Sequence, residues 1–190
     1  MANPAITGLI LAGGAGRRMG GVDKGLVEYL DRPLVFHAIE RFAPQVGPLL
    51  VSANRNLETY RSLGFPLVSD AEPDYPGPLA GLLAGLTACE TEWLACIPCD
   101  CPALPLDLVA RLKDRIAGPD ALVAVACVAG RMQPTFQLCH RSLRPALQDY
   151  LASGERRMGG WCRQQGAVEA DFPDPAAFRN INTAAELDAS

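Results

Sequence analysis

Hydrophobic residues along the chain gather into short runs that contain few polar positions. The first run is Ile-Thr-Gly-Leu-Ile-Leu-Ala at residues 6–12, and five more follow at intervals. Short, nearly unbroken apolar runs are typical of strands that are buried on both faces of a sheet. We therefore expect strands at residues 6–12, 49–53, 66–69, 93–98, 121–128 and 134–139.

The segments between these runs carry hydrophobic residues at helical spacing. In residues 33–46 the apolar positions fall on one helix face, and Pro33 suits a first helical turn. Residues 79–89 are apolar on nearly every side, which indicates a buried helix. Further helices are expected at residues 57–63, 106–116, 143–151 and 156–165, and the capping-box spacing of Thr183 and Glu186 predicts a short final helix.

Strands that alternate with helices predict a three-layer α/β/α fold of the Rossmann-like kind, in which helices cover both faces of a mostly parallel sheet. The strands at 121–128 and 134–139 are joined by a short loop at Gly130, so we expect a late antiparallel element. A length of 190 residues without a linker-like segment favours one domain over residues 1–190.

Composition narrows the classes of partner and compartment. The formal net charge of −4 gives no general attraction to nucleic acid or to an anionic membrane, so neither is expected as a partner. No apolar stretch reaches the ~20 residues of a membrane-spanning helix, and the amino terminus lacks the features of a signal peptide. Seven cysteines in a chain without an export signal indicate free thiols in the cytoplasm.

A glycine-rich loop with three cations follows the first strand. Gly13 and Gly14 allow backbone amides to point into one concavity, and Arg17, Arg18 and Lys24 add positive charge. The loop is not a P-loop, because glycine rather than serine or threonine follows Lys24, and it lacks the third glycine of the dinucleotide fingerprint. A plain strand–helix connection is the alternative, but the cations favour a polyphosphate ligand.

Polar side chains also follow three of the other expected strands, at Asn54, Asp70 and Asp100. Ligands of open α/β sheets bind outside the carboxyl ends of the strands, so these residues predict a cleft at one edge. Asp100 lies in a Pro-Cys-Asp-Cys-Pro turn and offers the hard oxygen that Mg²⁺ takes beside a triphosphate. The alternative, a helix cap, is less favoured because the next expected helix begins several residues later. For Asp70, a simple turn is an open alternative.

Cys96 and Cys99 have the spacing of a redox or zinc motif. No second cysteine pair or nearby histidine completes a zinc set, and the pair does not open a helix as in thioredoxin-type motifs. We interpret these cysteines as small buried residues.

Two segments near the carboxyl end contain groups that suit an anion. One is Gly154-Glu155-Arg156-Arg157, and the other is Asn180-Ile181-Asn182-Thr183. The first could equally be a solvated helix start, and the second a strand end with a helix cap. Binding of a second, anionic substrate remains the open alternative for both.

The order Leu11-Ala12-Gly13-Gly14-x-x-Arg17-Arg18-Met19-Gly20-x-x-Asp23-Lys24 resembles the signature of nucleotidyltransferases that use a nucleoside triphosphate and release pyrophosphate. More narrowly, the chain resembles the molybdenum cofactor guanylyltransferases. The supporting segments are Ser52-Ala53-Asn54-Arg55, Asp74-Tyr75-Pro76-Gly77-Pro78-Leu79-Ala80-Gly81, Pro98-Cys99-Asp100 and the two segments near the carboxyl end. These segments extend in order from residue 9 to 186, so the resemblance covers nearly the whole chain.

The resemblance implies transfer of GMP from GTP to the terminal phosphate of a molybdenum-molybdopterin cofactor, with Mg²⁺. It implies catalytic roles for Arg18, Lys24 and Asp100, with Asp100 as the Mg²⁺ ligand. Implied nucleotide contacts are Leu11, Ala12, Gly13, Gly14, Arg17, Lys24, Ser52, Asp70 and Asp100, and implied acceptor contacts are Gly81, Arg157, Asn180 and Asn182. Two positions depart from the family, which often has asparagine at Ser52 and threonine at Cys101.

Two other functions stay open at this point. A cytidylyltransferase acting on molybdopterin or on a sugar-alcohol phosphate would share the same loop, because base choice depends on a few pocket contacts. A nucleotide-binding regulatory protein without turnover is less favoured, because Asp100 and the basic loop are intact. We expect a monomer that makes transient contacts with cofactor-delivery proteins.

Overall fold

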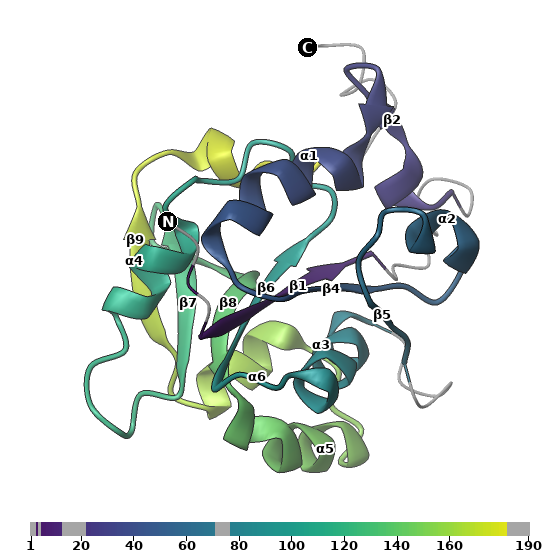
Figure 1. Ribbon diagram of the computed structural model, residues 1–190. Helices are drawn as coiled ribbons and strands as arrows, with labels where there is room; N and C mark the ends of the chain where they lie inside the picture. Colours follow the sequence, from purple (N-terminus) through teal and green to yellow (C-terminus); the bar gives the residue numbers. More distant parts are fainter. Residues whose placement is uncertain (1–2, 4, 13–21, 71–76, 182–190) are drawn as a thin grey trace.

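A seven-stranded sheet forms the centre of the computed structural model, which describes residues 3, 5–12, 22–70 and 77–181 (Figure 1). The strands lie in the order β5-β4-β1-β6-β8-β7-β9. Their bounds are β1 Ile6–Leu11, β4 Leu49–Ser52, β5 Leu67–Val68, β6 Trp93–Pro98, β7 Val123–Val128, β8 Arg131–His140 and β9 Val168–Phe172. Strand β8 runs antiparallel to β6 and β7, whereas the other neighbours pair in parallel. The predicted late antiparallel element is confirmed.

Helices cover both faces of this sheet (Figure 1). One face carries α1 (Leu34–Phe42), α2 (Leu57–Arg61) and α4 (Leu108–Asp114), and the other carries α3 (Pro78–Ala88), α5 (Arg144–Ala152) and α6 (Met158–Gln164). The predicted three-layer α/β/α arrangement is therefore confirmed.

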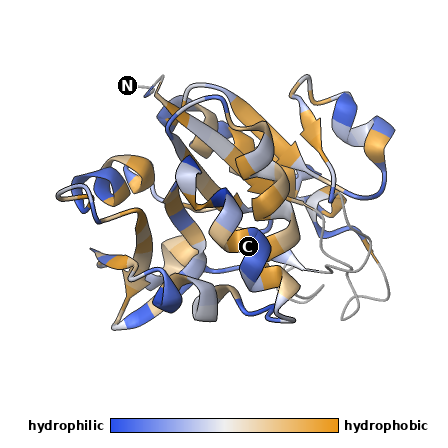
Figure 2. Cartoon of the chain, turned by 90° about the horizontal axis from the view of Figure 1, so that it is seen from below, coloured by the Kyte–Doolittle hydropathy of each residue, from blue (hydrophilic) through white to orange (hydrophobic). Residues whose placement is uncertain are grey.

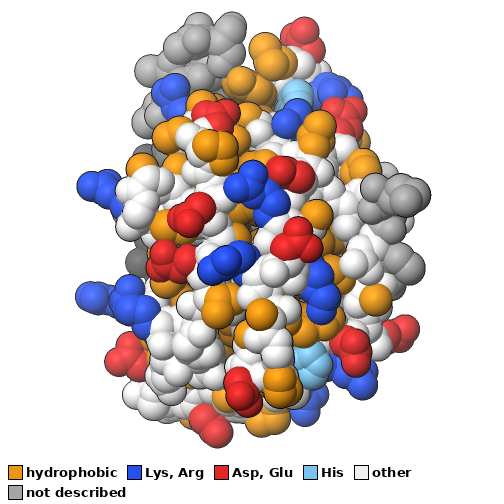
Figure 3. Space-filling view, turned by 90° about the vertical axis from the view of Figure 1, so that its left-hand side faces the viewer, with side chains coloured by type: hydrophobic (Ala, Val, Ile, Leu, Met, Phe, Trp, Pro, Cys, Tyr) orange, Lys and Arg blue, Asp and Glu red, His pale blue; other side chains and the backbone are white. Residues whose placement is uncertain are grey.

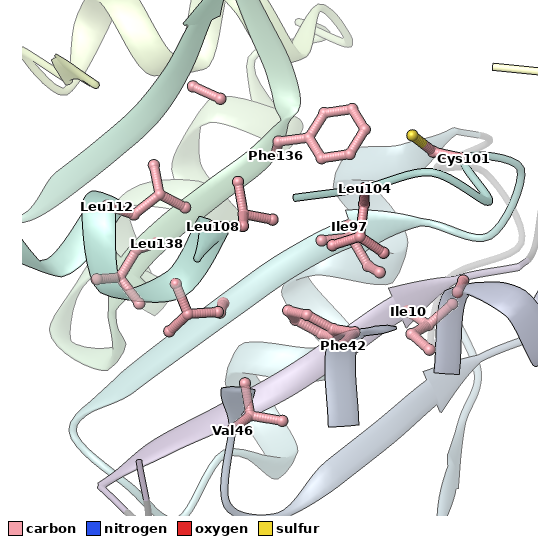
Figure 4. Close-up of a cluster of buried hydrophobic side chains, with 14 of the residues drawn as sticks. Ile10, Phe42, Val46, Ile97, Cys101, Leu104, Leu108, Leu112, Phe136 and Leu138 are labelled. Atoms are coloured by element: carbon pink, nitrogen blue, oxygen red, sulfur yellow. The ribbon is translucent and has the colours of Figure 1, made fainter. Parts of the chain in front are cut away.

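Alternate residues of the central strands supply two hydrophobic cores, one on each face. In β1, Ile6 and Ile10 belong to the core beneath α1, and Leu9 belongs to the core beneath α3. Figure 4 shows the first core, in which labelled side chains from α1, β1, β6 and α4 form one cluster that reaches Cys101 beyond the end of β6. In Figure 2 the hydrophobic colour runs through the strands, while the outer helices carry both colours. Burial on both faces explains why β1 is apolar at almost every position.

The structure differs from the sequence prediction around the first helix. The helix predicted at 33–46 ends as an α-helix at Phe42 and continues as the 3-10 turn Ala43–Gln45, because Pro44 has no amide hydrogen for the helical ladder. Before it, β2 (Glu28–Tyr29) and β3 (Arg32–Pro33) form a small antiparallel hairpin that sequence patterns did not predict. The helix expected at 183–186 lies outside the described residues.

Strand β9 was also absent from the sequence prediction. Its residues Val168, Ala170 and Phe172 alternate with the exposed Glu169 and Asp171, which is the period-two pattern of a half-buried strand. The signal was therefore present, but it is shorter and more polar than the runs of the central strands.

Arg111 of α4 and Arg115, which follows the helix, hold this last strand against the molecule. Arg115 Nε donates to the carbonyl oxygen of Glu169 at 2.8 Å, and Arg111 donates to the carbonyl oxygen of Asp171. Figure 3 looks onto this side, where positive and negative side chains are interspersed. Among the described residues, no helix has the length and apolar character needed to cross a bilayer.

Candidate active site

Four strands of the sheet end at one edge. Leu11 at the end of β1 pairs with Ser52 of β4 and with Pro98 of β6, and Ser52 pairs with Val68 of β5. The residues that follow these strand ends, Ala12, Asn54, Asp70 and Asp100, therefore emerge at the same carboxyl edge. The sequence-based prediction that these polar groups share one edge is confirmed.

Lys24 and Asp100 form an ion pair at this edge. Lys24 Nζ lies 3.0 Å from Oδ2 of Asp100. Lys24 begins the 3-10 turn Lys24–Leu26, and Asp100 lies two residues beyond the end of β6. The side chains are 26% and 11% exposed, so both are shielded yet accessible to a small ligand. The structure thus brings two of the three predicted catalytic residues into direct contact.

The second carboxylate oxygen of Asp100 is suited to a metal ion. Oδ1 is buried and accepts no hydrogen bond within the part of the chain that the structure describes. A buried carboxylate oxygen without a donor is costly, and a hard cation satisfies it. No group of three candidate metal ligands gathers among the described residues. Mg²⁺ commonly takes one or two carboxylates and completes its shell with phosphate and water oxygens, so this residue fits the predicted role.

Asp23, the residue before Lys24, is held by two hydrogen bonds and one ion pair. Its Oδ1 accepts a hydrogen bond from the Tyr60 hydroxyl at 2.7 Å, and its Oδ2 accepts one from Asn56 Nδ2 at 2.9 Å. Arg55 Nε lies 3.9 Å from the same Oδ2, and the Asp23 side chain is only 5% exposed. Sequence reasoning gave Asn56 and Tyr60 no role, because nothing in their order along the chain indicates that they meet Asp23.

Asp70 is paired with a neutral side chain. Asn54 Nδ2 donates to Asp70 Oδ2 at 2.8 Å, and Asn54 Oδ1 accepts from the Asp70 amide at 3.0 Å. Burial raises the pKa of the Asp70 carboxyl above its ordinary value, and the Asn54 hydrogen bond opposes this only in part. The two residues form a reciprocal clamp between the segments that follow β4 and β5.

Ser52 and Gly81 lie in direct contact. A side chain placed on Gly81 would have its Cβ 2.7 Å from Ser52 Oγ and 2.8 Å from Leu11 Cδ2, closer than real Cβ atoms approach. Ser52 is 1% exposed, so its hydroxyl is packed beneath α3. The resemblance placed these residues at different subsites, yet the structure makes them one packed contact between β4, β1 and α3.

The segment around residue 180 is joined to Asp100. The Ile181 amide donates to the Asp100 carbonyl oxygen at 2.9 Å, and Cys101 Sγ donates to the Ala177 carbonyl oxygen at 3.3 Å. Asn180, predicted to contact the acceptor, is therefore held next to the Lys24–Asp100 pair. The segment around residue 180 thus lies beside Asp100, and the contact of Asn180 with the acceptor stays a prediction.

Comparison with known proteins places this geometry in a family. Residues 8–168 match the MobA-like NTP transferase domain. The molybdenum cofactor guanylyltransferase of Bordetella petrii is 52% identical over 186 residues, which cover 96% of this chain and 95% of that relative.

The chain belongs to the MobA-like NTP transferase family. Its similarity to the Bordetella petrii protein further places it among the molybdenum cofactor guanylyltransferases, which confirms the resemblance inferred from sequence. The protein is a nucleotidyltransferase, and the carboxyl edge described above is its candidate active site.

Solved structures of this nucleotidyltransferase fold agree with the architecture. The molybdopterin-guanine dinucleotide biosynthesis protein A of Archaeoglobus fulgidus superposes with a TM-score of 0.75 at 20% identity, covering 96% of this chain and 95% of that one. A 4-diphosphocytidyl-2C-methyl-D-erythritol synthase from Anaerococcus prevotii gives a TM-score of 0.75 at 11% identity, with 97% and 93% coverage. At such identities the likeness shows the fold alone.

Arg157, a further predicted acceptor contact, lies at the N-cap of α6 with an exposed side chain. Its carbonyl oxygen accepts a hydrogen bond from the Tyr150 hydroxyl at 3.0 Å. The nearby Gly159 approaches Pro134, which in antiparallel β8 lies toward the carboxyl end of β6. In this member of the family Arg157 therefore lies toward the same edge, on the side of the sheet that carries α3 and α5.

Several predicted site residues lie outside the described residues, namely Gly13, Gly14, Arg17, Arg18 and Asn182. Around the glycine-rich loop, the structure describes Leu11 and Ala12 before residue 13 and Val22, Asp23 and Lys24 after residue 21. Ala12 is fixed to the neighbouring strand because its amide donates to the Ser52 carbonyl oxygen at 2.8 Å.

The cysteines of this nucleotidyltransferase match the interpretation as buried residues. All seven are free and buried. Burial raises the pKa of the Cys96 and Cys99 thiols, and the same cause raises the pKa of Cys101 to about 12. Thiols with raised pKa values stay protonated and are poor nucleophiles near neutral pH.

Proposed function

We propose that the protein transfers GMP from GTP to the terminal phosphate of molybdenum-molybdopterin, releasing pyrophosphate and forming the guanine dinucleotide form of the cofactor. The observation that carries this proposal is the 52% identity to a molybdenum cofactor guanylyltransferase along 96% of the chain. The contact between Lys24 and Asp100 at the strand edge adds the chemistry that such a transfer needs.

The reaction joins two anions and expels a third. An oxygen of the acceptor phosphate attacks the α-phosphorus of GTP, and the bond from that phosphorus to the oxygen bridging to the β-phosphate breaks. The acceptor is already an anionic nucleophile, so no side chain has to remove a proton from it. The tasks left to the chain are positioning and neutralisation of charge.

Lys24 is suited to neutralise the phosphates that leave. It lies at the carboxyl edge beside Asp100, where an ammonium group meets the triphosphate of a nucleotide bound outside the strands. Arg17 and Arg18, together with the amides of Gly13 and Gly14, are assigned to the same leaving group. Charge that grows on the leaving oxygen is the charge that such cations stabilise most.

Asp100 would hold Mg²⁺ through its buried Oδ1. When bound, Mg²⁺ supplies positive charge to phosphate oxygens of the nucleotide and the acceptor. The hydrogen bond from the Ile181 amide fixes the backbone of Asp100, and the ion pair with Lys24 holds its Oδ2.

The remaining predicted residues divide between the two substrates. Leu11, Ala12, Ser52 and Asp70 are assigned to the nucleoside, and Gly81, Arg157, Asn180 and Asn182 to the pterin substrate. For Ser52 and Gly81, the burial of their contact favours a role in shaping the floor of the site, with the Ser52 hydroxyl turned toward α3.

The test measures pyrophosphate release and dinucleotide formation with molybdenum-loaded molybdopterin. We expect turnover with GTP and Mg²⁺, at least about 100-fold less with CTP, and none when Mg²⁺ is omitted. We expect this roughly 100-fold preference for GTP because a pocket that forms hydrogen bonds with guanine would leave polar groups unpaired when cytosine is bound. Preferred use of CTP would identify a cytidylyltransferase, and nucleotide binding without product would identify a regulatory protein.

A further inference from the structure

The turn that carries Lys24 is anchored by a hydrogen-bond network around Asp23, and the proposed transfer reaction gives these side chains no direct task. Asp23 is a nearly buried carboxylate whose two oxygens accept hydrogen bonds from Tyr60 and Asn56. The Leu26 amide in turn donates to the Asp23 carbonyl oxygen at 3.0 Å, which closes the turn around Lys24. The residue before Lys24 is thus tied to the segment that follows β4, and the residues after Lys24 are tied back to the turn itself.

Tyr60 reaches Asp23 only because Gly25 leaves room. A Cβ on Gly25 would collide with the Tyr60 hydroxyl and lie 3.3 Å from Cys99 Sγ. Tyr60 is fully buried, and this burial, more than the neighbouring Cys99 and Asp23, raises the pKa of its hydroxyl. The hydroxyl therefore remains a donor to Asp23 throughout the working pH range.

Asn56 occupies a helix N-cap position but does not cap the helix with its side chain. It occupies the N-cap of α2, where an asparagine side chain normally accepts a hydrogen bond from the helix, but it makes no such bond. Its amide donates to Asp23 instead, and its backbone adopts the left-handed region with φ 50°. Strained backbone that persists in a fold is often connected with function.

We propose that Asp23, Asn56 and Tyr60 form a positioning network that aims Lys24 at the phosphates of the nucleotide. The network rests on the proposed function, because Lys24 has a task only if a triphosphate is bound. None of the three side chains needs to touch substrate. They act by fixing the Lys24–Leu26 turn, so that the Lys24 ammonium lies at the position where it meets Asp100.

A positioning role differs measurably from a purely structural one. If the network acts through Lys24, its loss matters only while Lys24 is present. Lys24 stabilises charge that grows as pyrophosphate leaves, so a misplaced ammonium lowers kcat more than it raises KM for GTP. A structural role would instead lower the melting temperature and change the kinetics equally with or without Lys24.

The experiment is a double-mutant cycle between Tyr60→Phe and Lys24→Ala, with kcat and KM for GTP measured on the full chain with the loaded acceptor. We expect Tyr60→Phe to lower kcat about tenfold, the loss typical of one hydrogen bond to a charged group. KM should change less than about threefold. In the Lys24→Ala background the same change should alter kcat less than about twofold, because coupled residues are not additive.

Asn56→Gly provides a second variant that keeps the positive φ and deletes only the amide. It lies on the surface, so folding should survive, and its kcat loss should also vanish in the Lys24→Ala background. Tyr29→Phe is the matched control, since it removes the same atom from the β2–β3 hairpin, where the ring packs edge-on against His37. Additive losses in the cycle, or normal kcat in both network variants, would overturn the proposal. A wild-type protein without GTP-dependent product would instead overturn the proposed function.

Discussion

Two aspartates lie at the carboxyl edge of the same sheet, yet their surroundings differ. Each carboxylate keeps one buried oxygen that accepts no hydrogen bond from the described residues, but only Asp100, after β6, faces the Lys24 ammonium. Asp70, after β5, faces the neutral amide of Asn54, and burial raises its pKa. Between them, Ser52 and Gly81 contribute no charge and fit by shape alone.

The comparison shows that one part of this sheet edge depends on charge and another part depends on close packing. The Lys24–Asp100 end depends on charge, and changes that preserve volume but remove charge should be severe there. The Ser52–Gly81 region depends on close approach, and changes of a single methyl group should be felt there first. Substitutions at Asp100, Gly81 and Asp70 separate the dependence on charge from the dependence on close approach.

The largest effect is expected for Asp100→Ala. Loss of the metal-binding carboxylate and of the Lys24 partner should lower kcat/KM by about 10³-fold or more. The fold should survive, because the Ile181 amide bonds to the Asp100 backbone oxygen, which the variant retains. Steady-state kinetics and circular dichroism would check both points. A variant with near-normal rate would remove Asp100 from the metal role.

A smaller effect, on stability rather than charge, is expected for Gly81→Ala. The added methyl group would overlap Ser52 Oγ and Leu11 Cδ2, and should lower the free energy of unfolding by about 1–2 kcal/mol after the gain in helix propensity. Adding Ser52→Ala should restore part of the loss by removing one of the two overlaps. Denaturant unfolding would measure each step.

Gly159→Ala is the matched control for that series. Gly159 is also helical, but its Cβ would find Pro134 at an ordinary 3.5 Å. This variant should gain up to about 1 kcal/mol from helix propensity. If both glycine variants changed stability alike, close packing at Gly81 would not be the reason for its glycine.

The smallest effect is expected for Asp70→Asn. Because burial raises the pKa of Asp70 in the folded state, the native protein holds a proton there that the unfolded chain has released, and the contribution of Asp70 to stability falls as pH rises through that window. The variant should match wild type at lower pH and become more stable above the ordinary aspartate range. The gain should stay below about 1 kcal/mol, because the Asp70 side chain is only partly buried. Unfolding curves across pH 3–7 would detect it; a stability gap independent of pH would contradict the assignment.

Much of the fold was predictable from sequence because the central strands are buried on both faces. In Ile6–Leu11 and Trp93–Pro98 almost every residue must be apolar, so the pattern is strong and the strand bounds are nearly right. The edge strand Val168–Phe172 faces solvent on one side and has a weaker signal. The hairpin at residues 28–33 has two-residue strands, and its turn residues Leu30 and Asp31 have positive φ. It lacks the Asn-Gly or Asp-Gly pair from which such a turn can be predicted.

The candidate site was predictable where chemistry follows a strand directly. Asp100, Asp70 and Asn54 each come after an apolar run, so their shared edge follows from parallel pairing. The family resemblance implied that Lys24 contacts the phosphates and that Asp100 binds Mg²⁺, but it did not predict the direct contact between these two side chains, which the structure shows. The Tyr60 hydroxyl was not predictable, because a tyrosine in a short helix gives no sign of which distant residue it reaches.

The hydrogen bond from Ile181 to Asp100 bears on the order in which contacts at the site can form during synthesis. Strands β1, β4, β5 and β6 all leave the ribosome early and can pair with one another while translation continues. Strand β8 must then take its place beside β6, and the chain must extend past β9 before Ile181 can clamp Asp100. A chain that ended before residue 181 would lack this hydrogen bond, and the backbone of its Asp100 would lose one of its anchors.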